Sequence, residues 1–243
     1  MIFSSSNSDF TFCIGMTMFN RSEYLRKTLD SLSKVNYFKN TKFFLVDDCS
    51  TDEQVGILAS NFIRYMSPTL QCFYLKNSMN VGSKENYLNL IKQMKQVDAD
   101  FYIIIDSDCI FNSNWLCQIQ KIISLQPDKN TCVYTSWYVP QNIKAHYSNI
   151  LESHDNYNVT MTVNGTGMVL PKCLLKYFEP EELNFEVYNK RHFDGYVSFY
   201  LKEKLGLRFI GPKVSYMDHF GIIGVNSSTE EYCERATDFI GEN

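Results

Sequence analysis

The chain has 243 residues, of which 44% are hydrophobic and 21% are charged, so it can bury the core of one large or two small globular domains and is neither intrinsically disordered nor collagen-like. A formal net charge of -4 argues against nucleic acid as a partner, because binding to a phosphate backbone requires a basic surface. The apolar runs are too short for a transmembrane anchor and residues 1–10 lack the features of a secretory signal, so we expect a cytoplasmic protein.

The first half of the chain alternates predicted strands with predicted helices. Short apolar runs are typical of strands at residues 11–15, 43–46, 71–75 and 101–105. Helices are expected from Ser22, after the capping pair Thr51 and Asp52, and after the turn at residues 80–82, because apolar residues follow each point at helical spacing. Apolar strands joined by helices indicate an α/β fold with a doubly wound, mostly parallel sheet.

Beyond Asp108 the pattern becomes irregular. We expect helices over residues 115–125 and 195–205, a strand over 132–136, and extended segments over 167–170, 208–210 and 214–217. Residues 140–160 form a polar stretch, and aromatic residues in or near it belong either to a mobile lid or acceptor wall or to the core: Trp137, Tyr138, Tyr147 and Tyr157. A final helix is expected within residues 229–240.

Acidic residues follow two of the predicted strands. In an open α/β sheet, ligands bind beyond the carboxyl ends of the strands. The triplet Asp106-Ser107-Asp108 follows the fourth strand, and its carboxylates suit a hard divalent cation that is shared with substrate phosphates. A D-x-D triplet alone is more often a solvated turn or a helix cap. Its place at a strand end, with a second acidic pair at the equivalent end of another strand, favours ligand binding.

That second pair is Asp47-Asp48, at the end of the second strand. Helix capping by Thr51 or Asp52 explains only one residue of this acidic loop. Two carboxylates after a buried strand are costly unless hydrogen bonds, for instance to a nucleobase or a ribose hydroxyl, offset their desolvation. Lys84, near the start of the third helix, is either a phosphate contact or an exposed solubilising lysine.

The order and spacing of these motifs resemble those of family 2 glycosyltransferases, which have the GT-A fold. The segments that carry the resemblance are Gly15–Leu25 (GMTMFNRSEYL), Val46–Asp52 (VDDCSTD), Asn80-Val81-Gly82 and Asp106-Ser107-Asp108. The resemblance implies a nucleotide-diphosphate sugar donor, with a UDP-sugar as first candidate. It places Thr17 and Asp48 near the base and Asp106 near the ribose. Because they follow the same strand ends, we include Asn20, Asp47 and Lys84 in the predicted donor site.

The resemblance also implies a metal ion. Asp108 would hold Mn²⁺ or Mg²⁺, which bridges the donor phosphates and neutralises the charge that develops on the departing diphosphate. His219 matches a histidine that often completes this metal site in relatives, and an imidazole is a suitable ligand. Asp218 is its nearest competitor, and a purely structural role for His219 is the alternative.

The second half would then supply the acceptor site and the base. Asn164–Met168 resembles the family's glycine-containing strand beside the sugar, or is an ordinary turn. Asp194 stands where the family commonly has an acidic general base, which takes the acceptor's proton in an inverting transfer. It could equally be only a helix cap, and Phe193 precedes it where many relatives have glutamate.

We therefore predict one GT-A domain over residues 1–243, with a Rossmann-like, mostly parallel sheet flanked by helices and an irregular C-terminal half. Within it, residues 11–110 would bind the nucleotide sugar, residues 111–225 would bind the acceptor and carry out catalysis, and residues 226–243 would form a tail. The acceptor is a glycan, protein or lipid-linked hydroxyl. One alternative is a non-catalytic nucleotide-sugar or carbohydrate-binding module. The other is a sugar-phosphate nucleotidyltransferase, whose Gly-rich loop the first motif lacks.

Overall fold

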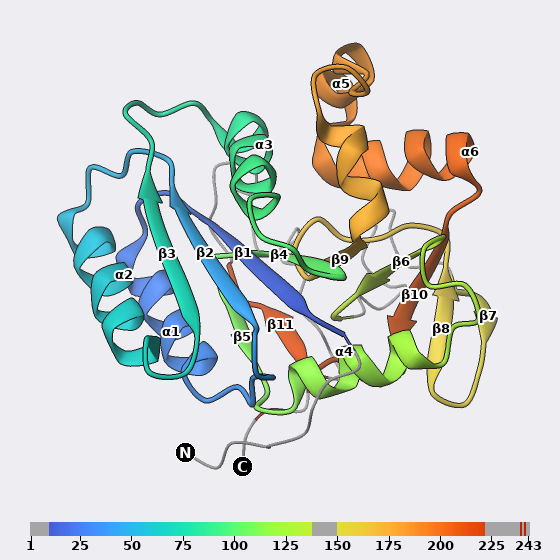
Figure 1. The fold of residues 1–243 in the computed structure, drawn as a ribbon, viewed down its shortest axis with the longest axis horizontal. Coiled ribbons are helices and arrows are strands. Elements are labelled where there is room, and N and C mark those ends of the chain that lie inside the picture. Colours follow the sequence, from blue (N-terminus) through green and yellow to red (C-terminus); the bar gives the residue numbers. More distant parts are fainter. Residues whose placement is uncertain (1–9, 138–149, 222–238, 240, 242–243) are drawn as a thin grey trace.

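The computed structural model describes residues 10–137, 150–221, 239 and 241, and its centre is a nine-stranded sheet (Figure 1). The order across the sheet is β3 (Gln71–Lys76), β2 (Lys42–Asp47), β1 (Phe12–Met18), β4 (Phe101–Asp106), β9 (Met168–Pro171), β6 (Cys132–Thr135), β10 (Arg208–Pro212), β8 (Tyr157–Thr160) and β7 (Ile150–Ser153). A second sheet pairs β5 (Cys109–Phe111) with β11 (Met217–His219).

Strand direction confirms a mostly parallel sheet. β1 runs parallel to β2 and β4, β2 to β3, and β6 to β10. β9 is antiparallel to β4 and β6, and β8 is antiparallel to β10 and β7. Only β9 and β8 therefore run against the other strands of this sheet. The parallel part is the N-terminal half, where helices connect successive strands.

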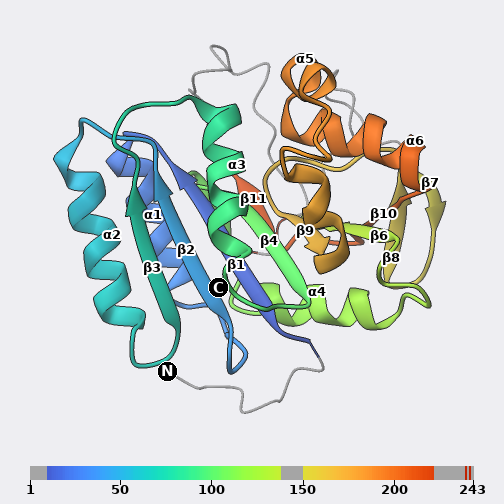
Figure 2. The same ribbon diagram turned by 45° about the horizontal axis from the view of Figure 1, so that its top comes forward.

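Helices cover both faces of the sheet, as Figures 1 and 2 show. α1 (Ser22–Leu32), α2 (Glu53–Met66) and α4 (Trp115–Ser124) pack into one apolar core. The opposite core contains α3 (Ser83–Met94), the 3₁₀ helix η1 (Lys172–Phe178), α5 (Phe185–Gly195), the π-helix η2 (Tyr196–Leu201) and α6 (Lys202–Leu205). Alternate residues of each central strand enter the two cores, because successive side chains point to opposite faces.

A glycine lets α3 approach the centre of the sheet. A Cβ on Gly15 of β1 would lie 2.3 Å from Met94 Sδ and 2.8 Å from Leu90 Cδ1, both on α3. A larger residue would have to displace these two side chains. The close packing therefore sets the C-terminal half of α3 directly against β1.

The N-terminal half agrees with the sequence analysis. All four predicted strands and all three helices are present, and Asp52 caps α2 by accepting a hydrogen bond from the amide of Gln54 at 3.0 Å. In the C-terminal half, α4, β6, β9 and β10 lie where ordered segments were expected.

Several expectations for the C-terminal half were wrong or incomplete. The predicted polar stretch includes the strand pair β7 and β8, and the extended segment expected at 214–217 begins as a strand only at Met217. The helix over 195–205 is η2 followed by α6, and α5, η1 and β5 were not predicted. Tyr138 and Tyr147 lie outside the described residues, as does almost all of the predicted helix at 229–240.

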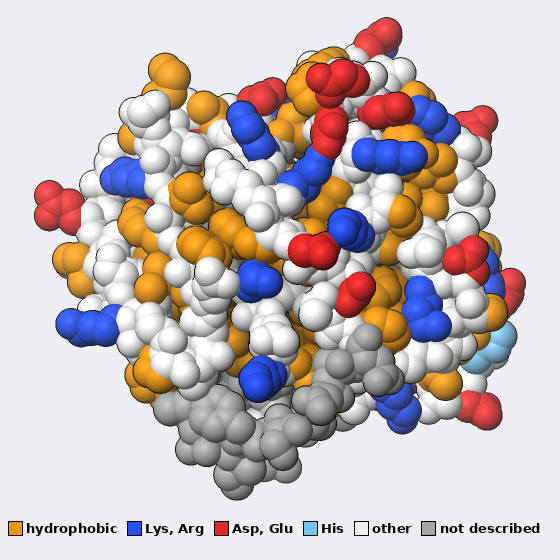
Figure 3. Space-filling model, viewed as in Figure 1, with side chains coloured by type: hydrophobic (Ala, Val, Ile, Leu, Met, Phe, Trp, Pro, Cys, Tyr) orange, Lys and Arg blue, Asp and Glu red, His pale blue; other side chains and the backbone are white. Residues whose placement is uncertain are grey.

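Within the described ranges, no helix combines the length and apolar character that crossing a bilayer requires. On the face shown in Figure 3, Lys and Arg side chains are interspersed with Asp and Glu. Among the described residues on that face, no continuous basic surface of the kind that binds a phosphate backbone is visible.

Candidate active site

Asp108 and His219 meet through the small two-stranded sheet. The register of β11 and β5 pairs His219 with Cys109, and the amide of Phe220 donates to the carbonyl of Asp108 at 3.0 Å. As a result, His219 Nε2 lies 3.1 Å from Asp108 Oδ1. On the other carboxylate oxygen, Arg21 Nη1 lies 2.9 Å from Oδ2. The structure thus brings the two predicted metal ligands together and adds an arginine.

The Asp108 carboxylate is almost enclosed, with 5% of the residue exposed. Burial opposes its ionisation, but the hydrogen bond and charge of His219 and the charge of Arg21 outweigh burial and hold the pKa of Asp108 below its ordinary value. A Cβ on Gly221 would lie 2.1 Å from Oδ2, so only glycine fits against this carboxylate. Asp218, the competing ligand, is 1% exposed and points away from His219, since neighbouring strand residues face opposite sides.

Asp106, the last residue of β4, is held by hydroxyl groups. Tyr87 Oη donates to Asp106 Oδ1 at 2.6 Å, and Thr17 Oγ1 donates to the same oxygen at 3.0 Å. The amide of Asp106 donates to Thr166 Oγ1 at 2.9 Å. Burial and the neighbouring charge of Asp108 raise the pKa of Asp106. The predicted pair Thr17 and Asp106 is therefore in direct contact, at the edge of the sheet that also carries Asp108.

Tyr87 also connects this edge to Asp194. Its ring stacks on Phe193, with centroids 5.0 Å apart and an interplanar angle of 3°. Burial raises the pKa of Tyr87 well above its ordinary value, and the negative charges of Asp106, Asp194 and Asp108 add to the effect. Tyr87 thus contacts Asp106 through its hydroxyl and Phe193, the residue before the predicted base, through its ring.

Asp194 follows a break in the helix. His192 has φ 60° and ψ -176°, a conformation that costs a non-glycine residue about 1–3 kcal/mol and interrupts α5. Asp194 thus lies in the first turn of the segment that continues into η2. Burial raises the pKa of Asp194, against the lowering effect of the backbone amides of Gly195 and Asp194 itself. A base with a raised pKa is better matched to proton abstraction near neutral pH.

The segment Asn164–Met168 borders this site, but as a turn before β9 rather than as a strand. A Cβ on Gly165 would lie 3.5 Å from the Cβ of Asp194. Gly167 has φ +74°, and a Cβ there would lie 2.8 Å from Met217 Cε. Of the predicted lid aromatics, Trp137 is fully buried and its Nε1 donates to the carbonyl of Thr166 at 2.9 Å. Trp137 therefore packs beneath the site, as the core alternative requires.

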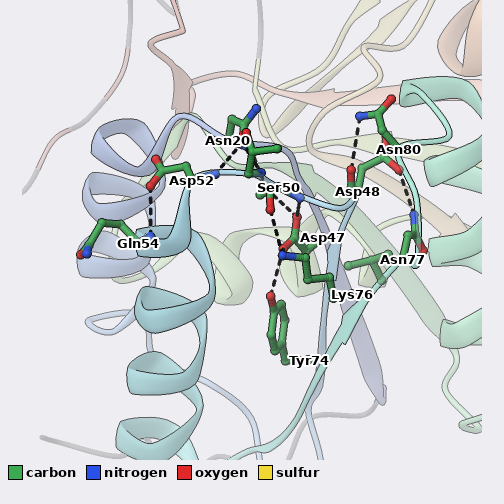
Figure 4. Close-up of polar contacts among 12 residues, drawn as sticks. Asn20, Asp47, Asp48, Ser50, Asp52, Gln54, Tyr74, Lys76, Asn77 and Asn80 are labelled. Carbon is green, nitrogen blue, oxygen red and sulfur yellow. Dashed lines mark hydrogen bonds and ion pairs between the residues drawn. The ribbon is translucent and has the colours of Figure 1, made fainter.

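Asp47 belongs to the protein interior, and Figure 4 shows its polar contacts. It is 0% exposed, because its position in β2 directs it toward α2. Its carboxylate accepts from the amide of Ser50 at 2.9 Å and from Tyr74 Oη at 2.9 Å, with Lys76 Nζ at 4.0 Å. The environment of Asp47 thus supports a structural role instead of the predicted donor contact.

Asp48 points to the opposite face and holds the loop that precedes α3. Its Oδ1 accepts from the amide of Val81 and its Oδ2 from the amide of Gly82, both at 2.9 Å, and Asn77 Nδ2 lies 3.0 Å from Oδ1. Asn80 Nδ2 donates to the Asp48 carbonyl at 3.2 Å (Figure 4). These contacts explain why the motifs Val46–Asp52 and Asn80-Val81-Gly82 occur together. The Asp48 carboxylate anchors the loop that follows β3.

Asn20 and Lys84 likewise bind the protein itself. Asn20 Oδ1 accepts from the amides of Thr51 at 2.9 Å and Asp52 at 3.1 Å, which joins the first loop to the start of α2. Lys84 Nζ donates to the carbonyl of Asn189 on α5. The Oδ1 of Asn20 and the ammonium of Lys84 thus hold the donor-side loops together, and the donor contacts of the two residues stay predictions.

Arg21, Tyr87 and Thr166 contact the predicted carboxylates but were not singled out from the sequence. Arg21 and Thr166 lie within segments that carried the resemblance, yet their contacts with Asp108 and Asp106 span 87 and 60 residues. For Tyr87, the available signal was its place on the apolar face of α3. No local pattern distinguishes such a tyrosine from a core residue.

Known proteins resemble this chain in sequence and in fold. Residues 13–206 match the model of glycosyl transferase family 2. An uncharacterized glycosyltransferase of Mycoplasma genitalium is 30% identical over 105 residues, which are 43% of this chain and 33% of that protein. TarS of S. aureus in complex with UDP-GlcNAc superposes with a TM-score of 0.58 at 18% identity, over 85% of this chain and 57% of that chain.

The mannosyltransferase PcManGT of Pyrobaculum calidifontis, in complex with GDP-Man and Mn²⁺, gives a TM-score of 0.59 at 14% identity, over 87% of this chain and 58% of that chain. The present chain thus spans a third of the curated relative and less than two thirds of either solved chain. The superpositions confirm the predicted GT-A fold. Because the family model covers most of its length, the chain belongs to glycosyl transferase family 2.

Proposed function

We propose that the protein is a metal-dependent, inverting glycosyltransferase that moves a sugar from a nucleotide-diphosphate donor, with a UDP-sugar as first candidate, to an acceptor hydroxyl. The observation that carries the proposal is the arrangement around Tyr87. Asp106 accepts its hydrogen bond, Asp108 and His219 lie beside Asp106, and Phe193, the residue before Asp194, stacks on its ring. Family membership favours glycosyl transfer over the nucleotidyltransferase alternative.

The residues fit a metal site that the donor completes. Asp108 and His219 offer a carboxylate and an imidazole 3.1 Å apart, a ligand set that suits Mn²⁺. The described part of the chain holds no group of three or more His, Cys, Asp or Glu side chains that could bind a metal by itself. The remaining ligands would come from the diphosphate. When bound, the ion would supply Lewis-acid assistance to the leaving group.

Thr17 and Asp106 would bind the nucleoside. Both Tyr87 and Thr17 donate to Asp106 Oδ1, and the described residues place no hydrogen bond on its Oδ2. That oxygen can accept a ribose hydroxyl. PcManGT holds GDP-Man and TarS holds UDP-GlcNAc on the same fold, so the fold does not select the base. The preference for UDP rests on the sequence resemblance.

Asp194 would act as the base. It takes the proton of the acceptor hydroxyl as that oxygen attacks the anomeric carbon opposite the leaving diphosphate, which inverts the configuration. Its burial supplies the raised pKa that this role needs. Gly165, whose missing side chain leaves space next to Asp194, gives the sugar or the acceptor room beside the carboxylate.

The test is release of nucleoside diphosphate from a panel of UDP- and GDP-sugars with Mn²⁺, alone and with candidate acceptors. The variants are Asp108→Asn and Asp194→Asn, with Asp155→Asn, an exposed carboxylate on the β7–β8 connection, as matched control. We expect release with at least one donor, abolished by Asp108→Asn and reduced about 10²–10⁴-fold by Asp194→Asn. Donor binding without release, unchanged in Asp194→Asn, would instead identify a non-catalytic binding module.

A further inference from the structure

Arg21 reaches Asp108 through an unusual turn. Asn20 and Arg21 both have left-handed backbones, with φ 51° and 59°, immediately before α1. The turn lays the guanidinium over the ring of Tyr24, 4.2 Å from its centroid, and Tyr24 stacks on Phe220 with centroids 5.5 Å apart. Phe220 is the neighbour of His219. The stacked rings of Tyr24 and Phe220 thus position the Arg21 guanidinium next to Asp108. The contact with the Tyr24 ring helps to stabilise the strained backbone at Arg21.

The guanidinium uses only part of its hydrogen-bonding capacity. Nη1 binds Asp108 Oδ2 at 2.9 Å, while Nη2 is buried and has no hydrogen-bond partner among the described residues. Leaving such a donor unsatisfied costs about 1–3 kcal/mol, so the arrangement is suited to an additional acceptor. Because Gly221 packs against both Nη2 and Asp108, that acceptor would lie next to the predicted metal position.

Both oxygens of Asp108 are occupied by the protein. His219 Nε2 contacts Oδ1, and Arg21 contacts Oδ2. A cation that approached Asp108 would meet the positive charge of Arg21 on the same carboxylate. Without an added anion, the two cations repel each other and compete for Oδ2. With a diphosphate present, the anion can bind both and give Nη2 its missing acceptor.

We propose that Arg21 is the counter-ion of Asp108 in the donor-free protein and that a divalent ion displaces it. The displaced guanidinium then pairs with the diphosphate of the donor. This inference rests on the proposed function. Arg21 therefore opposes metal binding when no nucleotide is present and supports it when nucleotide is present. The metal site becomes dependent on the donor, which limits occupation by a metal ion alone. Arg21 is thus a donor-binding residue that pairs with Asp108 when no donor is bound.

The experiment measures Mn²⁺ binding directly, by electron paramagnetic resonance of free Mn²⁺, with and without UDP and with no turnover. The variants are Arg21→Gln, which keeps a polar side chain but removes the charge, and Arg21→Lys, which keeps the charge. Arg26→Gln, an exposed arginine on α1, is the matched control. Circular dichroism and thermal unfolding establish that each variant is folded.

For Mn²⁺ alone, we expect Arg21→Gln to bind roughly fivefold more tightly than wild type, the value of one partly exposed ion pair. In the presence of UDP, the same variant should bind roughly tenfold more weakly, because a charge-assisted contact to the diphosphate is lost. Arg21→Lys should lie between Arg21→Gln and wild type in both conditions, and Arg26→Gln should match wild type.

Equal or weaker Mn²⁺ binding by Arg21→Gln without UDP would overturn the competition, and equal binding with UDP would overturn the diphosphate contact. Asp108→Asn separates this inference from the proposed function. If Asp108→Asn binds Mn²⁺ as wild type does, the proposed metal site itself is wrong. If Asp108→Asn abolishes binding while Arg21→Gln has no effect, the metal site stands and only the role of Arg21 fails.

Discussion

Tyr87 joins the two halves of the site, and replacing it with phenylalanine separates its two contacts. Tyr87→Phe removes the hydroxyl that donates to Asp106 Oδ1 at 2.6 Å but keeps the ring that stacks on Phe193. Tyr87→Leu removes both contacts. If Asp106 orients the donor and Phe193 orients the base, the two variants should affect different kinetic constants.

The structure sets the size of each effect. A hydrogen bond to a charged group contributes about 1.5–3 kcal/mol, and about 1.4 kcal/mol corresponds to tenfold in a rate or binding constant. Asp106 keeps the hydroxyl of Thr17 at 3.0 Å, so we expect the lower end of this range. Tyr87→Phe should therefore raise the KM for the donor about tenfold and leave kcat within about twofold. Tyr87→Leu should in addition lower kcat, because Phe193, the residue before Asp194, loses its stacking partner.

The assay is steady-state release of nucleoside diphosphate with the donor concentration varied at saturating Mn²⁺. Tyr65→Phe, at a side chain that is 51% exposed, serves as the matched control and should match wild type. Thermal unfolding of each variant excludes a general loss of structure. A Tyr87→Phe enzyme with the wild-type KM, or a Tyr87→Leu enzyme with the kcat of Tyr87→Phe, would refute the proposed link between Asp106 and Asp194.

Three further predictions follow from single contacts. Because burial raises the pKa of Asp194, its ionised form destabilises the folded state, and Asp194→Asn should raise Tm at pH 7. This gain should disappear below about pH 4, where the carboxyl is protonated in both the folded and the unfolded state. A lower Tm at pH 7 would contradict the burial argument. Asp48→Asn must turn an amide NH₂ toward either Val81 or Gly82, so it should lower the free energy of unfolding by about 1.5–3 kcal/mol in urea titrations, and an unchanged midpoint would refute the anchoring role. Gly15→Ala should cost about 1–3 kcal/mol by overpacking against Met94, measured in the same way, whereas a neutral effect would show that α3 does not need the glycine.

The strands and helices of the N-terminal half could be predicted because their signals are local. Each strand is a short apolar run, and each helix begins at a recognisable cap or turn. The same short apolar runs do not show toward which face of the sheet each side chain points. Residues 43–46 are all buried, so no alternation between apolar and polar residues shows which face each one occupies. Asp47 and Asp48 consequently seemed equivalent in the sequence, although one packs toward α2 and the other anchors the loop before α3.

The C-terminal half depends on contacts between distant residues. His219 reaches Asp108 only because β5 and β11, each three residues long, pair across more than a hundred residues. Strands of this length carry no periodic signal. Positive φ angles at Arg21 and His192 help to set the positions of the Arg21 guanidinium and the Asp194 carboxylate. Neither turn contains a glycine that would mark it in the sequence. Asp108 stood out as part of an acidic triplet at a strand end, and Asp194 and His219 came from the family resemblance, whereas the neighbours of all three required the fold.

In the proposed function, Asp108 and His219 hold a divalent ion together with the diphosphate of a donor. The most direct measurement is an anomalous difference map from crystals grown or soaked with Mn²⁺ and UDP, collected at the manganese absorption edge. We expect a peak within coordination distance of Asp108 and His219, next to the diphosphate, and Arg21 moved from Asp108 onto the phosphates. Ordered UDP with no manganese peak beside Asp108, or a peak at another site, would contradict it.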